Sequence, residues 1–109
     1  MRILFDHGVP IGLARGLPSH TVVTAQARNW DRLANGALLT VAETAGLDLF
    51  ITTDRRIRYQ QNLSQRRIAI VVPTGSTKWS RVRLRFEQIL AAVDAATPGS
   101  YTEVAIPFD

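Results

Sequence analysis

Two aspartates stand where two predicted strands end. Asp6 follows the apolar run at 3–5, and Asp54 follows the run at 49–53. Ligands of a parallel sheet collect beyond the carboxyl ends of its strands, so we expect the two side chains to converge. Two carboxylates within about 4–6 Å of each other repel, which favours a divalent cation such as Mg²⁺ or Mn²⁺ between them. The pair therefore predicts a metal site that can assist phosphodiester hydrolysis.

Each aspartate also has a structural interpretation. Asp6 precedes Gly8, and Asp54 precedes a polar segment that favours a helical turn. Either side chain can therefore be a helix N-cap, which contributes about 1 kcal/mol. Taken singly, each position favours the cap. As a pair at two strand ends, the positions favour the catalytic and metal-binding site.

His7 and Asn35 are further candidates for this site. His7 can bind a metal or act as a general base near neutral pH, or it can be an exposed histidine at a helix start. Asn35 can supply an oxygen ligand, although we favour the N-cap of a helix that begins at Gly36. Glu43 lies eight residues after Asn35, about 12 Å along a helix, and is excluded from the site.

Three arginines and three amide side chains follow Asp54, namely Arg55, Arg56, Arg58, Gln60, Gln61 and Asn62. Beside a metal, the arginines would neutralise RNA phosphates, and the amides would bind bases or sugars. The alternatives are a solvated basic turn and amides that close this turn by satisfying its backbone groups. Trp79 begins an apolar stripe and is predicted to pack in the core, while Trp30 fits either a core position or base stacking.

The composition is typical of one globular domain, residues 1–109. Apolar residues make up 46% of the 109, charged residues 20%, and cysteine is absent, which excludes disulfides and thiolate metal sites. Twelve of the 13 basic residues are arginine and the net charge is +4, which fits either a polyanionic partner or a coding bias. No apolar run approaches the roughly 20 residues of a membrane span, so no membrane partner is expected. We expect a cytoplasmic protein.

Strands and helices alternate along the chain. The predicted strands are 2–5, 20–24, 48–53, 68–72 and 102–106, and the predicted helices are 9–17, 35–45 and 79–96, with shorter helical turns in 25–32 and 54–63 and a loop at 73–78. Gly46 is predicted to end the second helix. This alternation predicts an α/β fold, a three-layer α/β/α sandwich around a mainly parallel sheet of about five strands.

Several segments resemble the PIN-like family of small bacterial proteins described as predicted nucleases of predicted toxin–antitoxin systems. They are Ile-Leu-Phe-Asp-His-Gly-Val-Pro at 3–10, Asn-Gly-Ala-Leu-Leu at 35–39, Thr-Thr-Asp at 52–54, Tyr-Gln-Gln-Asn-Leu at 59–63 and Ala-Ala-Thr-Pro-Gly-Ser-Tyr at 95–101. The resemblance implies a PIN-like sandwich, metal-dependent endoribonuclease activity with Mg²⁺ or Mn²⁺, an RNA substrate and an antitoxin partner.

By this resemblance, Asp6 matches the acid after the first strand, and Asp54 matches the acid of the Thr-x-Asp motif. Two positions depart from the pattern. Residues 35–37 carry no acid, and His7 stands where many relatives have Glu. Two carboxylates bind Mg²⁺ more weakly than three or four, because the number of charged ligands sets the affinity. These departures support a competing hypothesis, a catalytically lapsed scaffold that binds protein or nucleic acid. A homodimer through the last strand or the basic helix is a third hypothesis.

Overall fold

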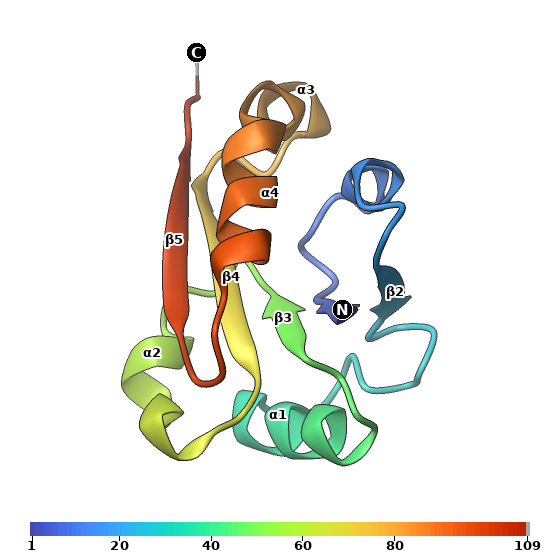
Figure 1. Ribbon diagram of the computed structural model, residues 1–109, viewed down its shortest axis with the longest axis vertical. Helices are drawn as coiled ribbons and strands as arrows, with labels where there is room; N and C mark the ends of the chain where they lie inside the picture. Colours follow the sequence, from blue (N-terminus) through green and yellow to red (C-terminus); the bar gives the residue numbers. More distant parts are fainter. Residues whose placement is uncertain (109) are drawn as a thin grey trace.

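The computed structural model of the chain describes residues 1–108, and residue 109 of the predicted domain lies outside them. Its strands form one sheet in the order β2-β1-β3-β4-β5, with every neighbouring pair parallel (Figure 1). The elements, in chain order, are β1 Arg2–Phe5, the 3₁₀ helix η1 Ile11–Gly16, β2 Thr21–Thr24, α1 Asn35–Thr44, β3 Leu49–Ile51, α2 Ile57–Gln60, η2 Leu63–Gln65, β4 Ala69–Gly75, α3 Trp79–Val82, η3 Arg83–Arg85, α4 Phe86–Ala95 and β5 Tyr101–Ile106.

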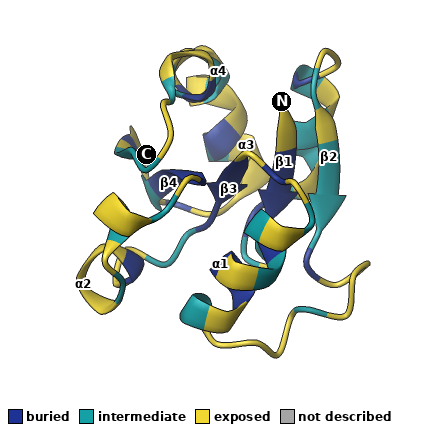
Figure 2. Ribbon diagram, turned by 60° about the horizontal axis from the view of Figure 1, so that its bottom comes forward, coloured by how far each residue is buried: buried dark blue, intermediate teal, exposed yellow. Residues whose placement is uncertain are grey.

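Side chains that alternate along the strands build two separate cores. On one face of the sheet, Ile3 and Phe5 of β1 pack with residues of η1, α3 and α4. On the other face, Leu4 packs with residues of α1 and α2. The central strands β1, β3 and β4 carry mainly buried positions, whereas the edge strand β2 is half-buried and the helices expose their outer sides (Figure 2). Because both faces are covered, the predicted three-layer α/β/α sandwich with a parallel sheet is confirmed.

Helix α1 ends as the sequence predicts. Gly46 adopts a positive φ of 80°, and its N–H donates to the carbonyl of Glu43 at 3.0 Å. The N–H of Leu47 donates to the carbonyl of Ala42 at 3.0 Å. These two bonds form a Schellman motif, which favours glycine at the position with positive φ.

Replacing Gly46 with Ala is therefore expected to lower the free energy of unfolding by about 1 kcal/mol, because a Cβ is strained at this φ. Urea unfolding followed by circular dichroism measures the change. Ala45→Gly next to it is a useful comparison, since Ala45 has an ordinary helical φ of −78°. An unchanged midpoint for Gly46→Ala would show that the end of α1 does not need this conformation.

The helix predicted at 9–17 is instead the shorter 3₁₀ helix η1. Pro10 stands before its first residue, and the N–H of Leu13 donates to the Pro10 carbonyl. A Cβ on Gly12 would lie 2.9 Å from the ring of Trp79, so the glycine allows η1 to approach α3 closely. Low helix propensity at Gly12 and Gly16 favours this short, tightly wound segment over a full α-helix.

The single helix predicted at 79–96 is divided into α3, η3 and α4. A 3₁₀ turn advances about 120° per residue instead of about 100°, so three such residues rotate the following face by roughly 60°. Val82, Ile89 and Val93 remain buried, but Trp79 is 39% exposed. The prediction that Trp79 packs in the core is therefore wrong, because its ring lies against Gly12 of η1 at the surface.

Strand β4 continues through Pro73 to Gly75, where the sequence predicts a loop. The N–H of Thr52 donates to the carbonyl of Val71, and β3 ends at this level. Pro73 follows Val71 by two residues, so its backbone nitrogen faces the same side of β4. That nitrogen carries no hydrogen, but β3 has already ended on that side, so no ladder hydrogen bond is lost. Pairing with β5 continues on the other side, with Gly75 opposite Ile106.

Candidate functional site

The sheet register places Asp6 beside the end of β3. Phe5 is the partner of Ile51 in the β1–β3 ladder, and the N–H of Asp6 donates to the Ile51 carbonyl at 3.0 Å. Thr52 therefore follows β3 at the level where Asp6 follows β1. Asp54 comes two residues later. The prediction that both acids lie at the carboxyl edge of neighbouring strands is confirmed by this register.

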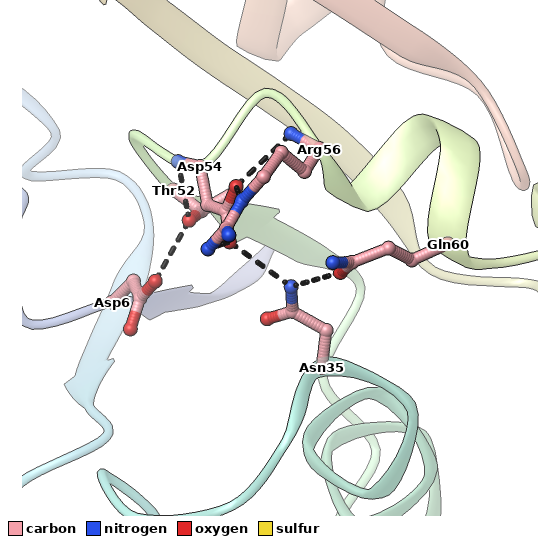
Figure 3. A network of polar contacts seen from close by, with 6 residues as sticks. All are labelled: Asp6, Asn35, Thr52, Asp54, Arg56 and Gln60. Atoms are coloured by element: carbon pink, nitrogen blue, oxygen red, sulfur yellow. Dashed lines mark hydrogen bonds and ion pairs between the residues drawn. The ribbon is translucent and has the colours of Figure 1, made fainter.

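The hydroxyl of Thr52 joins the two aspartates. It donates to Oδ2 of Asp6 at 2.7 Å and accepts the backbone N–H of Asp54 at 3.1 Å (Figure 3). Thr52 is fully buried, so this hydroxyl is held in one position. Thr52 is not among the site residues predicted from the sequence. The sequence feature that could have identified it is a hydroxyl residue directly after an apolar strand and two positions before an acid.

The carboxylate of Asp54 is paired with Arg56. Nε of Arg56 donates to Oδ1 at 3.0 Å, Nη2 donates to Oδ2 at 3.2 Å, and the backbone N–H of Arg56 donates to Oδ1 at 3.0 Å. The side-chain hydrogen bond from Arg56 is the largest influence on the pKa of Asp54 and lowers it, outweighing the opposing effect of burial. The same bond raises the pKa of Arg56. Asp54 is therefore a carboxylate whose charge is already compensated.

Asn35 approaches the same carboxylate from α1. Its amide nitrogen donates to Oδ2 of Asp54 at 3.2 Å and to Oε1 of Gln60 at 3.1 Å (Figure 3). The N-cap interpretation of Asn35 is wrong, because α1 begins at Asn35 and Ala34 is its N-cap residue. Asn35 presents a donor to Asp54, and it ties α1 to α2 through Gln60.

His7 contacts Asp6 through both its backbone and its ring. The backbone N–H donates to Oδ1 of Asp6 at 2.9 Å, and Nδ1 lies 3.3 Å from the same oxygen. A ring with its proton on Nδ1 would donate to this oxygen and present Nε2 as an acceptor. The ring is 67% exposed, whereas the side chain of Asp6 is 15% exposed. A groove of about 470 Å³ begins at this pair and is lined by Asp6, His7, Val9, Ile11, Thr24 and Gln26.

Neither aspartate caps a helix. The residue at the N-cap of η1 is Pro10, and the one at the N-cap of α2 is Arg56. Asp6 and Asp54 each accept a backbone N–H one or two residues further along the chain, in the manner of local turns. The cap interpretation is thus wrong in its geometry, although local backbone bonding does hold both carboxylates.

The other two predicted phosphate-binding arginines point toward β5. Nε of Arg55 lies 3.5 Å from Oε2 of Glu103, and Nη1 of Arg58 lies 3.6 Å from the same oxygen. The hydroxyl of Tyr101 donates to Glu103 at 2.8 Å; burial and this bond raise the pKa of Tyr101 to about 12. The guanidinium of Arg58 also lies over the ring of Tyr59, at 4.8 Å from its centre. Exposed ion pairs are weak, so both arginines can exchange Glu103 for phosphate.

The three predicted amides lie at the end of α2 and beyond it. Gln60 accepts from Asn35, and Oδ1 of Asn62 accepts from the hydroxyl of Ser64 at 2.6 Å. Gln61 is half-buried, while Gln60 and Asn62 are exposed. Gln60 therefore bonds a side chain of α1 and Asn62 bonds one of its own segment, while both residues remain exposed to solvent.

The donor set limits how a metal can bind. Among the described residues, no group of three or more His, Asp or Glu side chains could hold a metal ion. Asp6 and Asp54 are two carboxylates, and the nearest amide, that of Asn35, turns its nitrogen toward Asp54. Mg²⁺ is commonly held by one or two carboxylates together with substrate phosphate and water. The residues therefore fit Mg²⁺ or Mn²⁺ only as a site completed by a phosphate.

Glu43 lies outside the site, as predicted. It accepts from Nη1 of Arg66 at 2.9 Å and from the backbone N–H of Arg67 at 2.7 Å. Another groove, of about 480 Å³, is also at this amino edge of the sheet, lined by Met1, Glu43, Gly46, Leu47, Asp48, Arg67, Ala69, Ala96, Thr97 and Pro98. We place the candidate site at the smaller groove beside Asp6, because only that groove includes one of the two aspartates.

Comparison of the chain with protein-family models, curated proteins and solved structures found no match. Across residues 1–108, the helices are all too short or too polar to cross a lipid bilayer.

Proposed function

We propose that this chain is a PIN-like metal-dependent endoribonuclease and the toxin of a toxin–antitoxin pair. The parallel three-layer fold, the two aspartates at its carboxyl edge and the arginines that follow Asp54 support the proposal. One observation carries it. The buried Thr52 hydroxyl donates to the carboxylate of Asp6 and accepts the backbone N–H of Asp54, so the two residues lie on either side of one hydroxyl although 48 positions separate them in the sequence.

In the proposed reaction, Asp6 and Asp54 would hold one Mg²⁺ or Mn²⁺ together with a phosphate of the RNA. Such a cation would stabilise the charge that develops on the phosphodiester during hydrolysis. Thr52 keeps the carboxylate of Asp6 oriented, and Asn35 does the same for Asp54. His7 lines the same groove as Asp6, and there its ring would accept a proton from the attacking group.

Arg56 occupies the place of the cation when substrate is absent. Its side chain is 77% exposed, so it can leave Asp54 at little cost. A guanidinium binds phosphate with the same two-pronged geometry with which it binds carboxylate. We therefore assign Arg56 an exchange: it compensates Asp54 in the free protein and binds the RNA phosphate when the metal and substrate arrive.

Replacing Arg56 with Ala is expected to strengthen Mn²⁺ binding by about threefold or more, because the competing guanidinium is gone. The same change is expected to weaken the binding of single-stranded RNA, since a phosphate contact is lost. Calorimetric titration with Mn²⁺ and fluorescence anisotropy with labelled RNA measure the two effects. Arg67→Ala is the control, because its exposed side chain lies beside the opposite edge of the sheet. Equal Mn²⁺ affinity in Arg56→Ala and wild type would contradict the competition.

A second function is favoured by a specific observation. Arg56 and Asn35 together already satisfy both oxygens of Asp54. A lapsed scaffold binds protein or nucleic acid without cleaving it, so its Asp54 needs no metal ion in addition to these partners. The two functions differ in one experiment. The nuclease loses RNA cleavage in Asp54→Asn, whereas the scaffold cleaves no RNA and keeps its binding in the same variant.

A further inference from the structure

Five positive charges without a carboxylate partner within residues 1–108 lie on neighbouring helical segments. Among the described residues, no ion pair or hydrogen bond involves the side chains of Arg15, Lys78, Arg81, Arg83 and Arg85. All five lie on η1, α3 and η3 or next to them. By contrast, Arg55, Arg56, Arg58 and Arg66 each pair with a carboxylate. The segments η1, α3 and η3 therefore carry cationic side chains that no carboxylate among the described residues compensates.

An apolar groove runs through this surface. It has a volume of about 360 Å³ and is lined by Gly12, Arg15, Gly16, Trp79, Arg83 and Phe86. Trp79 lies against the backbone of Gly12, which keeps the ring outside the core and leaves it 39% exposed. Leu84 on η3 is 51% exposed and Ile11 on η1 is 65% exposed. Exposed large apolar side chains therefore lie on the same helical segments that carry the unpaired cationic side chains.

We propose that this basic–apolar surface, defined by η1, α3 and η3, is the docking site for an acidic amphipathic segment of a partner protein. The two guanidiniums of Arg15 and Arg83 at the groove would pair with Asp or Glu of the segment. Its apolar side chains would cover Trp79 and Leu84. The lining of the groove contains no carboxylate, so an acidic segment meets no repulsion there.

A protein segment fits this surface better than RNA does. Base stacking uses the flat faces of aromatic rings, and Trp79 offers one. Leu84 and Ile11 are aliphatic and exposed, and they gain nothing from stacked bases. An amphipathic segment covers aliphatic and aromatic side chains alike, and it satisfies the arginines with its carboxylates.

The position of the surface indicates a regulatory consequence. Gly12, Arg15 and Gly16 of η1 line the basic–apolar groove, whereas Ile11 of η1 lines the groove that begins at Asp6. A segment bound along η1 is therefore next to the proposed catalytic groove and can block it. The docking itself does not require Asp6 or Asp54 to bind a metal, so its test is independent of the nuclease proposal.

The test uses the whole chain as bait for a displayed library of random 16-residue peptides. We expect enriched sequences that combine Asp or Glu with apolar residues at helical spacing. A synthetic peptide of the enriched sequence should shift the emission of Trp79 in a Trp30→Phe background, where Trp79 is the one remaining tryptophan. Its affinity should fall at least about tenfold for Arg15→Glu combined with Arg83→Glu. Arg32→Glu combined with Arg67→Glu, two exposed arginines outside the surface, is the matched control.

Three results would overturn the proposal. The enriched peptides would lack acidic residues, or their affinity would fall equally in both double variants. In the third case, a single-stranded RNA would shift the Trp79 emission at lower concentration than the peptide does, and the surface would then bind nucleic acid. Thermal unfolding of each variant establishes that a loss of binding reflects the surface and not the fold.

Discussion

Asp54→Asn is expected to reduce RNA cleavage by at least about 10²-fold in the presence of Mn²⁺. The substitution keeps the size of the side chain but removes one of the two negative charges that would hold the cation. It also removes the ion pair with Arg56 and places an amide where Asn35 already donates. Cleavage of a fluorophore–quencher RNA, followed over time at several Mn²⁺ concentrations, measures the effect.

The matched control is Asp31→Asn. Asp31 is exposed and lies in the loop before α1, and no hydrogen bond or ion pair of its carboxylate occurs among the described residues. Its cleavage rate should equal that of the wild type. If Asp54→Asn cleaves RNA as fast as Asp31→Asn, the proposed site is not the source of the activity.

Glu43→Ala is expected to have the largest effect on stability, about 2–3 kcal/mol, with a fall of roughly 10 °C in the melting temperature. Glu43 is 14% exposed and Arg66 is 19% exposed, so the pair lies largely out of water. Besides Arg66, the carboxylate accepts the backbone N–H groups of Arg67 and Ile68, at 2.7 and 3.3 Å. Removing it leaves a guanidinium and two N–H groups without their acceptor. Urea unfolding of the variant measures the loss.

The same carboxylate predicts how stability depends on pH. Burial raises the pKa of Glu43, but the bonds from Arg66, Arg67 and Ile68 together lower it below its ordinary value of 4.5. A group with a lowered pKa in the folded state stabilises the fold fully above its unfolded pKa. This stabilisation is lost as the pH falls from about 4.5 through the lower pKa of the folded state. Wild type should therefore lose stability in this range, and Glu43→Ala should lose less.

Glu87→Ala is the control for both measurements, because Glu87 is exposed on α4 and makes no ion pair with any of the described residues. It should change the free energy of unfolding by less than about 0.5 kcal/mol at neutral pH. Equal stabilities of Glu43→Ala and Glu87→Ala would show that the contact between Glu43 of α1 and residues 66–68 before β4 does not stabilise the fold.

The sequence was sufficient for the architecture and for the neighbourhood of Asp6 and Asp54. Strand periodicity and alternation with helices predict a parallel sheet, and a parallel sheet brings strand ends to one edge. The sequence did not predict that 79–96 is divided into three helical segments, or that β4 extends through Pro73. Both features depend on where β3 ends and on how Gly12 and Trp79 pack, which are properties of the assembled fold.

The detailed bonding of the site was also beyond the sequence. Arg56 is two residues from Asp54, and the sequence predicts it as a phosphate-binding residue, not as the partner of the carboxylate itself. Thr52 matters because the β1–β3 register places it opposite Asp6. Asn35 faces Asp54 because α1 begins one residue earlier than the cap interpretation requires. A shift of one residue in the strand register or in the start of a helix changes which polar atoms form hydrogen bonds.

The central claim is that Asp6 and Asp54 bind one divalent cation together with a phosphate. Mn²⁺ titrated into the ¹⁵N-labelled chain in the presence of inorganic phosphate tests it directly, because the paramagnetic ion broadens the amide signals near it. The account predicts the strongest broadening at Asp6, Thr52 and Asp54, and its loss in Asp54→Asn. Broadening that is centred on Glu43 and Asp48, or that persists unchanged in Asp54→Asn, would contradict it.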